Sequence, residues 1–570
     1  MSKLIQKVRE SVIGEKVPIE TPFGTKPLIY ADYTASGRAL AFIEDLIRDQ
    51  VLPYYANTHT ETSFTGAYTT HLRETARRTI RTAVNARDDD LVLFCGSGAT
   101  AAVQKVIDIF NLRIPHDLNR SYRLTDRIAE SERPVVFVGP YEHHSNELPW
   151  RESIADVVAV PLNAIGAIDL DYLQLKLKEY ANRPLKIGSF SAASNVTGIR
   201  TDTDLISEML HEHGALAFWD YAAAAPYMRI DMQGSVSHAK DCSKDAVFIS
   251  AHKFVGGPGT PGVLILNGKL VNNSVPSIPG GGTVSYVTPN GHRYCTDPHR
   301  REEGGTPSIV ESIRAGLVFA LQQEVGLDQI ERREHQFTRQ VMERWGAHPN
   351  IEILGPSQQA RLPIFSLRIR WRNKDLHYGF VVALLNDLFG IQARGGCSCA
   401  GPYAHALLDM SAEYSAVLER LFMGGEASLR PGWVRLNFNY FLDTSTVHYL
   451  LRAVELIADH GWRLLPFYQF DGLSGTWRYG GREVAPSITQ DSFAVLIERS
   501  ARAPSVESRQ AALPAWDLQQ LVTMAESILL EQRDDQARYV HHLSDEAKKI
   551  CWFALPQEVS HESLVSRQVA

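Results

Sequence analysis

The chain has 570 residues, enough for several domains that each bury a full hydrophobic core. Its content of 44% hydrophobic and 22% charged residues is that of an ordinary globular protein, and a net charge of -7 argues against a nucleic-acid partner. No run approaches the ~20 apolar residues that cross a bilayer, the charged N-terminus lacks the apolar core of a signal peptide, and six scattered cysteines make no disulfide framework. We therefore expect a cytoplasmic protein with no membrane partner.

Short apolar runs alternate with helix-like stretches between about residue 90 and residue 270. The runs lie at 90–95, 134–139, 156–162, 185–190, 215–220, 246–250 and 262–266. Because they are apolar throughout rather than at every second position, they are typical of strands buried on both faces of a mostly parallel sheet. The stretches between them, such as 100–110 and 203–213, have helical spacing. This alternation predicts a three-layer α/β domain.

The pattern changes after about Glu302. Helix-like stretches at 308–323 and 326–346, strand signals at 363–371 and 432–441, and a helix at 377–389 predict a smaller α+β domain. Beyond Leu465 come a hairpin candidate at 467–481 and amphipathic helical stretches around 514–530 and 533–550, which we interpret as extra packing or a dimer brace. We expect an N-terminal segment at 1–35 that packs with the small domain, a large domain at 36–320, a small domain at 321–465 and a helical extension of unknown role at 466–570.

A lysine directly follows the buried strand at 246–250, in the segment Phe248-ISAHKFVGGPGTPG. Lysine rarely ends a buried strand without a partner, and a reactive lysine needs the lowered pKa that desolvation and cationic neighbours supply. Beside Lys253, the side chains of Ser250 and His252 can donate hydrogen bonds to a phosphate group. A surface lysine after a strand is the alternative that this segment alone leaves open.

Asp220 and His143 each come at the carboxyl end of a further apolar strand. Because ligands of open α/β sheets bind beyond the carboxyl ends of the strands, both are candidates for ligand contact. The alternatives are a helix-capping aspartate and a histidine that is satisfied within its own loop. His143 and His144 lack the spacing of metal ligands on one face, so we assign no metal site.

The segment Leu93-FCGSGATAAVQKV is typical of a strand, a glycine turn and a helix. Gly96, Gly98, Ala99 and Thr100 would present backbone N–H groups and a hydroxyl at the start of that helix, which would form an anion site. The segment is neither a Walker loop nor a dinucleotide fingerprint, because Gly-Lys-Ser/Thr and the third glycine are missing.

In this order the segments resemble the class V aminotransferase family of fold-type I pyridoxal-phosphate (PLP) enzymes, particularly cysteine desulfurases and the desulfurase domain of molybdenum-cofactor sulfurases. The resemblance covers roughly residues 28–460. Its carriers are Ile29-YADYTASGRA, Cys95-GSGAT, Glu142-HHSN, Ser194-NVTG, Trp219-DYA, Ser250-AHK, Glu303-GGTP, Arg394-GGCSCAGP and Val434-RLNFNY. It implies the cofactor pyridoxal 5'-phosphate, a large domain with a mostly parallel sheet between helices, and a smaller α+β domain.

The resemblance also implies a role for each matching residue. Lys253 would carry the Schiff base and move protons, Asp220 would pair with the pyridinium nitrogen, and His143 would stack on the ring. The phosphate would be held by Ala99, Thr100, Ser250 and His252, and Thr306 would reach the phosphate of the neighbouring subunit of a homodimer with active sites at its interface. The substrate would lie near His59, Asn195, Arg394 and Arg435, with Arg435 as a bidentate clamp on its carboxylate.

The segment Ala393-RGGCSCAGPY bears on the reaction type. By resemblance, Cys399 aligns with the loop cysteine that attacks the substrate's sulfur and leaves as a persulfide. The Cys-x-Cys motif after Arg-x-Gly is closer to that of molybdenum-cofactor sulfurases than to that of bacterial desulfurases. A thiolate beside Arg394 would be activated by the positive charge. A zinc half-site and a pair of packing cysteines are the alternatives.

One position departs from the desulfurase pattern. Three residues after Asp220, desulfurases usually have a glutamine that bonds the phenolic oxygen of the cofactor, whereas this chain has Ala223. The leading interpretation is a cysteine desulfurase-like enzyme that acts on a small amino acid and passes sulfur to an acceptor protein or small molecule. Aminotransfer, epimerisation, and C–S or C–N lysis on another amino acid remain alternatives, as does a non-catalytic scaffold with the same fold.

Overall fold

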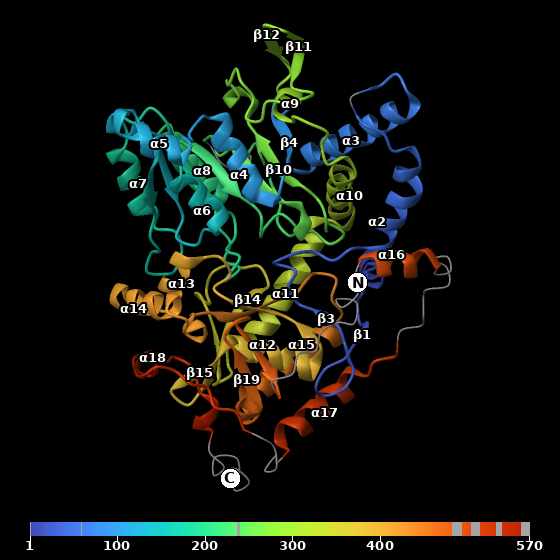
Figure 1. Cartoon of the computed structure of the whole chain (residues 1–570), viewed down its shortest axis with the longest axis vertical. Coiled ribbons are helices and arrows are strands. Elements are labelled where there is room, and N and C mark those ends of the chain that lie inside the picture. Colours follow the sequence, from blue (N-terminus) through green and yellow to red (C-terminus); the bar gives the residue numbers. More distant parts are fainter. Residues whose placement is uncertain are drawn as a thin grey trace.

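The computed structural model describes residues 2–58, 60–235, 240–480, 493–502, 514–531 and 538–559. It contains two regions, each built around a β-sheet, which lie in the upper and lower halves of Figure 1. Among the described residues, no helix combines the length and the apolar character needed to cross a membrane.

The larger sheet has seven strands, and all seven expected strands are confirmed. They are β4 (Leu91–Cys95), β5 (Val135–Val138), β6 (Asp156–Ala159), β7 (Lys186–Ser191), β8 (Leu216–Asp220), β9 (Ala246–Ser250) and β10 (Gly262–Leu266), in the spatial order β4-β10-β9-β8-β7-β5-β6. Every pair is parallel except those of β10, which runs antiparallel to both β9 and β4. The other six strands therefore all end at one edge of the sheet, which is also where β10 begins.

Successive residues of each central strand enter two separate cores. Val247 and Ile249 of β9 belong to one cluster of buried side chains, whereas Phe248 belongs to another that includes residues of α4 (Gly98–Ile109). This is why the strands are apolar at every position, since both faces are covered by helices. Other helices of this region are α3 (Phe64–Ala83), α6 (His144–Arg151), α8 (Thr203–Glu212) and α10 (Ile309–Val325). The predicted three-layer α/β fold is confirmed.

The smaller sheet contains β13 (Ile351–Ile353), β14 (Ile364–Trp371), β18 (Trp433–Asn437) and β17 (Arg394–Gly396), and β15 (Lys374–Leu376) also pairs with β14. It packs with α11 (Leu327–Trp345), α12 (Tyr378–Phe389) and α15 (Thr444–His460). Near the N-terminus, β3 (Ile29–Tyr30) pairs in parallel with β16 (Ile391–Gln392), just before β17. This pairing brings residues 29–36 and 394–400 to the same side of the molecule.

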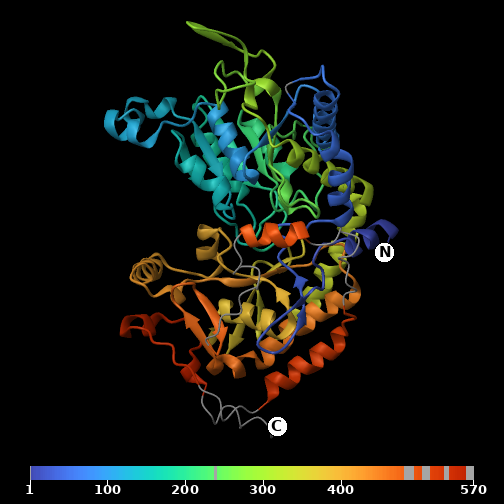
Figure 2. The same ribbon diagram turned by 45° about the vertical axis from the view of Figure 1, so that its right-hand side comes forward.

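Much of the C-terminal extension packs around the lower region in Figure 2, whereas its helix at 493–502 lies at the boundary between the two regions. The expected hairpin is confirmed as β19 (Tyr468–Asp471) and β20 (Thr476–Tyr479), followed by α16 (Phe493–Arg502), α17 (Leu518–Leu530) and α18 (Asp545–Ile550). The expected helix at 533–550 is wrong in extent. Residues 532–537 lie outside the described residues, 538–544 are not helical, and the helix begins at Asp545 because the Ser544 side chain caps it.

Further elements of the described residues are short or peripheral. They are α1 (Lys3–Glu10), α2 (Ala41–Leu46), α5 (His116–Tyr122), α7 (Leu170–Glu179), α9 (Pro298–Glu302), α13 (Gly401–Leu407), α14 (Ala412–Met423) and a small pair of strands, β1 (Pro18–Ile19) and β2 (Lys26–Pro27). A second hairpin, β11 (Val284–Thr288) and β12 (Gly291–Tyr294), projects at the top of Figure 1.

Candidate active site

A cavity of about 730 Å³ lies at the edge where the parallel strands of the large sheet end. Its lining brings together most of the predicted site residues: Ala99, Thr100, His143, Asn195, Asp220, Ser250, His252, Lys253, Arg394, Cys399 and Arg435. Thr306 does not line the cavity, and His59 lies outside the described residues. Residues from both sheets contribute, so the cavity lies between the two regions.

Lys253 ends a short turn, Ala251–Lys253, that directly follows β9. Burial disfavours the charged amine, and the charge of Arg435 adds to this effect, while Asp220 opposes it; together they lower the pKa of Lys253 to about 8. A substantial fraction of this amine is therefore neutral near pH 8, as a nucleophile or proton acceptor requires.

The glycine turn after β4 lies directly against the turn that carries Lys253. The N–H of Ala99 donates to Oγ of Ser250 at 2.9 Å. Gly98 has a φ of +56°, and a Cβ there would lie 2.9 Å from Oγ of Ser250 and 3.0 Å from Cε1 of His252. Only glycine leaves room for this approach. The start of β10 also holds the turn in place, because the N–H of Gly262 donates to the carbonyl of Gly96 at 2.8 Å.

Asp220 is the last residue of β8 and is almost fully buried. Its Oδ1 accepts a hydrogen bond from the N–H of Ala222 at 2.7 Å. Burial raises the pKa of Asp220, and the charge of Lys253 acts in the opposite direction. Both groups line the cavity, and the charge of each favours the charged form of the other. Ala223, the position that departs from the desulfurase pattern, also lines the cavity and presents no side-chain donor.

His143 caps the N-terminus of α6, where its Nδ1 accepts the N–H of Ser145 at 3.1 Å. Burial, together with the charge of Lys253, lowers the pKa of His143 to about 3, so the ring is neutral at physiological pH. The hydroxyl of Ser145 lies 2.6 Å from that of Thr100. This contact joins the start of α6 to the start of α4.

Glu142 is a buried residue of this region that the sequence analysis did not single out, although it opens the segment Glu142-HHSN. Its carboxyl group accepts hydrogen bonds from the N–H and hydroxyl of Ser191, at 2.8 and 2.6 Å, and from Nδ2 of Asn146 at 2.7 Å. Burial raises the pKa of Glu142 to about 7. The carboxyl ties the start of α6 to the end of β7, and so fixes the backbone that carries His143.

Asp32 was also missed, although it lies within the segment Ile29-YADYTASGRA. It bridges two arginines: Nε of Arg394 donates to one carboxylate oxygen at 3.0 Å and Nη2 of Arg435 to the other at 3.1 Å. The two arginines are register partners on β17 and β18. Arg435 also donates to the carbonyl of Asn195 at 3.0 Å, while its buried Nε has no hydrogen-bond partner among the described residues.

The loop that carries Cys399 is held by its backbone. Nδ2 of Asn195 donates to the carbonyl of Ser398 at 2.8 Å, and the N–H of His144 donates to the carbonyl of Cys399 at 2.9 Å. Ser398 and Cys399 both have a φ of +55°, a conformation that non-glycine residues rarely adopt. Cys399 is exposed and lines the cavity. The neighbouring Cys397 is half-buried, and Arg430 donates to its Sγ at 3.8 Å.

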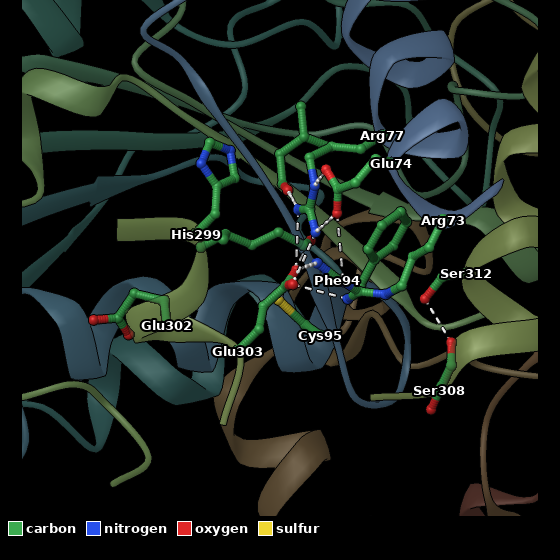
Figure 3. A network of polar contacts seen from close by, with 12 residues as sticks. Arg73, Glu74, Arg77, Phe94, Cys95, His299, Glu302, Glu303, Ser308 and Ser312 are labelled. Atoms are coloured by element: carbon green, nitrogen blue, oxygen red, sulfur yellow. Dashed lines mark hydrogen bonds and ion pairs between the residues drawn. The ribbon is translucent and has the colours of Figure 1, made fainter. Parts of the chain in front are cut away.

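Glu303 anchors the glycine loop that contains Thr306, and Figure 3 shows its side chain pointing toward Arg73 and Arg77. The sequence analysis did not single out Glu303. Its carboxylate accepts hydrogen bonds from Arg73 at 2.8 Å, from Arg77 at 2.9 Å and from the N–H of Phe94 at 2.8 Å. Burial opposes its ionisation, but the two arginine charges outweigh burial and hold the pKa of Glu303 at about 2. Thr306 itself is exposed and accepts a hydrogen bond from Asn57 at 3.2 Å.

The comparisons with known proteins agree with this architecture. The family model of aminotransferase class-V matches residues 29–418. A probable cysteine desulfurase of Halalkalibacterium halodurans is 28% identical over 380 residues, which cover 66% of this chain and 85% of the relative. A probable cysteine desulfurase of Staphylococcus epidermidis is 28% identical over 397 residues, 69% of this chain and 88% of the relative.

Solved structures confirm the fold. An apo cysteine desulfurase from Thermococcus onnurineus superposes with a TM-score of 0.60 at 21% identity, covering 76% of this chain and 95% of the other. A NifS-like protein from Rickettsia africae superposes with a TM-score of 0.57 at 16% identity, covering 76% of this chain and 99% of the other. The predicted family and the predicted fold class are both confirmed.

Proposed function

Because this chain belongs to the class-V aminotransferase family, we propose that it is a PLP-dependent cysteine desulfurase that carries sulfur as a persulfide on Cys399. The observation that carries the proposal is that the Cys399 thiol and the Lys253 amine line the same cavity. The relatives named as probable cysteine desulfurases support this choice among the reactions of the family.

The residues of the cavity fit PLP. The close approach of Gly98, Ser250 and His252 makes a cradle that a Cβ at position 98 would fill, as a phosphate site at a helix N-terminus requires. Asp220 would face the pyridine nitrogen, and the neutral ring of His143 would lie against the cofactor's face. PLP bound there would supply an electron sink for negative charge that develops on the substrate's α-carbon.

The side chains around the cofactor site each have a distinct task. The carboxylate of Asp220 is buried, and a positive charge beside it would offset the cost of that burial. Asp220 would therefore favour the protonated, positively charged form of the pyridine nitrogen. Lys253, with a pKa near 8, would take a proton from the α-carbon and return it elsewhere. The lowered pKa of His143 would keep its ring neutral while the ring packs against the cofactor.

The substrate's carboxylate would lie at the arginine pair. Among the residues that the structure describes, Arg394 and Arg435 share one carboxylate, that of Asp32, so the cluster retains a net positive charge. The unpartnered Nε of Arg435 is a buried donor that a substrate oxygen would satisfy. Asn195 would position Arg435 through its backbone carbonyl, and His59 is proposed as a substrate-side residue on the strength of its sequence context.

Sulfur transfer would begin with Cys399. Its thiolate attacks the sulfur of the substrate cysteine, an S–S bond forms, the substrate's C–S bond breaks, and the electron pair passes to the carbon side. Lys253 would return a proton to that carbon fragment, which leaves as alanine. The thiol of an acceptor, either a protein or a small molecule, then attacks the outer sulfur, so that the acceptor becomes the persulfide and the Cys399 thiolate is restored. A second thiol that attacks the acceptor's persulfide releases the sulfur as sulfide and leaves a disulfide, as the two thiols of dithiothreitol would do.

We also propose a homodimer in which Thr306 of each subunit reaches the partner's phosphate site. Its exposed position, outside the lining of its own cavity, supports this arrangement. All six cysteines are free, which supports a reducing compartment such as the cytoplasm.

The decisive experiment incubates the PLP-loaded enzyme with L-cysteine and dithiothreitol and measures alanine and sulfide together. We expect equal amounts of both products, their loss in Lys253→Ala and in Cys399→Ala, and their retention in Cys397→Ala, the matched control on the same loop. Absence of alanine in the wild type, or full activity of Cys399→Ala, contradicts the proposal. Because Ala223 offers no donor to the cofactor, the same assay should include other amino acids, whose turnover would indicate another reaction of the family.

A further inference from the structure

Several aromatic side chains of the C-terminal extension pack against His377 at the start of α12, and one of them, Trp552, also stacks on Tyr378. The backbone carbonyl of Trp552 accepts the N–H of Asp375 at 3.2 Å, and the N–H of Ala554 donates back to Asp375 at 2.8 Å. Together with the bridge between Asp375 and Phe553, these bonds add a short segment of the extension beside β15. The position of the Trp552 ring is therefore fixed by backbone pairing as well as by packing.

The Trp552 ring lies over the residues at the start of α12. It stacks on His377, with ring centroids 5.4 Å apart and an interplanar angle of 23°, and on Tyr378, at 6.1 Å and 11°. Burial holds the pKa of His377 at about 3, so this stack is between neutral rings. Stacked, offset arrangements of this kind are favourable for aromatic side chains.

Tyr378 in turn packs on the strand that leads into the cysteine loop. A Cβ at Gly395 would lie only 2.6 Å from Cδ2 of Tyr378, and a Cβ at Gly432 would lie 2.8 Å from Cε1 of the same ring. The ring therefore touches the backbones of β17 and of the residue that precedes β18. These two strands carry Arg394 and Arg435, and β17 ends one residue before Cys397.

A second route leads from the indole N–H. Nε1 of Trp552 donates to the carbonyl of Leu429 at 3.0 Å. The next residue, Arg430, donates to Sγ of Cys397 at 3.8 Å. Trp552 is thus connected to the cysteine loop, Cys397–Ala400, by two indirect routes. Its ring stacks on Tyr378, which packs on β17, and its N–H group bonds Leu429, whose neighbour Arg430 contacts Cys397.

We propose that Trp552 is a positioning residue for the cysteine loop, so that the C-terminal extension sets the orientation of the Cys399 thiol toward Lys253. The part of the inference that concerns sulfur transfer rests on the proposed function. The part that concerns the loop does not, since it concerns only the packing around Cys397 and Cys399. The backbone strain at Ser398 and Cys399 makes such support necessary, because a conformation of this kind persists only when its surroundings impose it.

The experiment compares Trp552→Ala and Trp552→Phe in the full-length, PLP-loaded enzyme. The matched control is Trp516→Ala, because Trp516 belongs to the same extension and its indole N–H also donates to a backbone carbonyl, that of Lys16, at 2.9 Å. Alkylation by iodoacetamide, followed residue by residue with mass spectrometry, reports the loop, and protection of the buried Cys95 reports the fold.

We expect Trp552→Ala to raise the alkylation rate of Cys397 severalfold and to lower kcat for cysteine about tenfold, with KM and Cys95 protection unchanged. Trp552→Phe should restore most of both, and Trp516→Ala should match the wild type. Wild-type alkylation and kcat in Trp552→Ala overturn the inference, as does loss of Cys95 protection together with failure of Trp552→Phe to restore the loop. If the wild type itself yields no alanine, the proposed function fails while the alkylation rates still decide the role of Trp552.

Discussion

The amine of Lys253 is the group on which the chemistry of the cavity centres. Because only the neutral amine can react with the aldehyde of PLP, we predict that the PLP-free enzyme takes up the cofactor at a rate that rises with pH through about 8, the lowered pKa of Lys253. The measurement is the growth, after PLP is added, of the visible absorbance band that the lysine-bound cofactor gives.

The direction in which Asp220 shifts the pKa of Lys253 provides a control experiment. The negative charge of Asp220 favours the protonated amine, so Asp220→Asn should move the midpoint of this pH profile below that of the wild type. A wild-type midpoint near the ordinary lysine value of 10.5, or an upward shift in the variant, would contradict this account of the site.

Some residues of the candidate site could be predicted from the sequence, and others could not. Lys253 and Asp220 were predicted because each ends or follows a strand whose apolar pattern is easily read, whereas Arg435 was predicted from the family resemblance of its segment. Asp32 was not, because its importance comes from pairing with Arg435, 403 residues away in sequence. Partners of that kind are fixed by how strands from different regions meet, and no local spacing records them.

At the scale of elements, Glu303 joins the glycine loop to α3 and β4. The side chains of Glu303, Arg73 and Arg77 are all at least 91% buried. We predict that Glu303→Gln lowers the free energy of unfolding by up to about 3–5 kcal/mol, because the two buried guanidinium groups lose their buried carboxylate and keep only that of Glu74, which is 42% exposed. Urea denaturation measures the change, and Glu546→Gln, which breaks an exposed pair with Arg420, should leave stability almost unchanged.

From the lowered pKa of Glu303 we also predict that its contribution to the free energy of unfolding depends on pH in the acid range. Its pKa is lowered to about 2 in the folded protein, against 4.5 in a free side chain, so its contribution is complete above pH 4.5 and is lost as the pH falls toward 2. The difference between wild type and Glu303→Gln should therefore shrink over that interval. A difference that stays constant there would show that the carboxylate charge contributes nothing.

Elements were predictable where burial alone decides them. The seven strands of the large sheet and the helices 309–325, 327–345 and 378–389 lie close to their expected positions, because hydrophobic periodicity reports burial. The antiparallel direction of β10 was not expected, since a run buried on both faces looks the same in either direction. The helix expected at 533–550 fails for a related reason, because amphipathic spacing does not fix where a cap begins the helix.

At the scale of the whole molecule, the projecting hairpin bears on assembly. Tyr286 is 67% and Val287 61% exposed, an unusual position for adjacent large apolar residues. We predict that sedimentation equilibrium gives a mass of twice 63.6 kDa and that Tyr286→Asp shifts the equilibrium toward monomer. As a control, Tyr122→Asp, at a similarly exposed tyrosine on α5, should remain dimeric. A monomeric wild type would contradict the proposed role of Thr306.

The antiparallel course of β10 also orders the events of biosynthesis. Among the strands of the described ranges, β4 pairs with β10 alone, which follows it by about 170 residues, so β4 leaves the ribosome long before this partner exists. Until then its polar backbone groups and apolar side chains stay available to other chains. The glycine turn that β4 carries can meet Ser250 and Lys253 only when β10 closes the sheet. Competence to bind the cofactor should therefore appear late and abruptly in the growing polypeptide, rather than build up strand by strand.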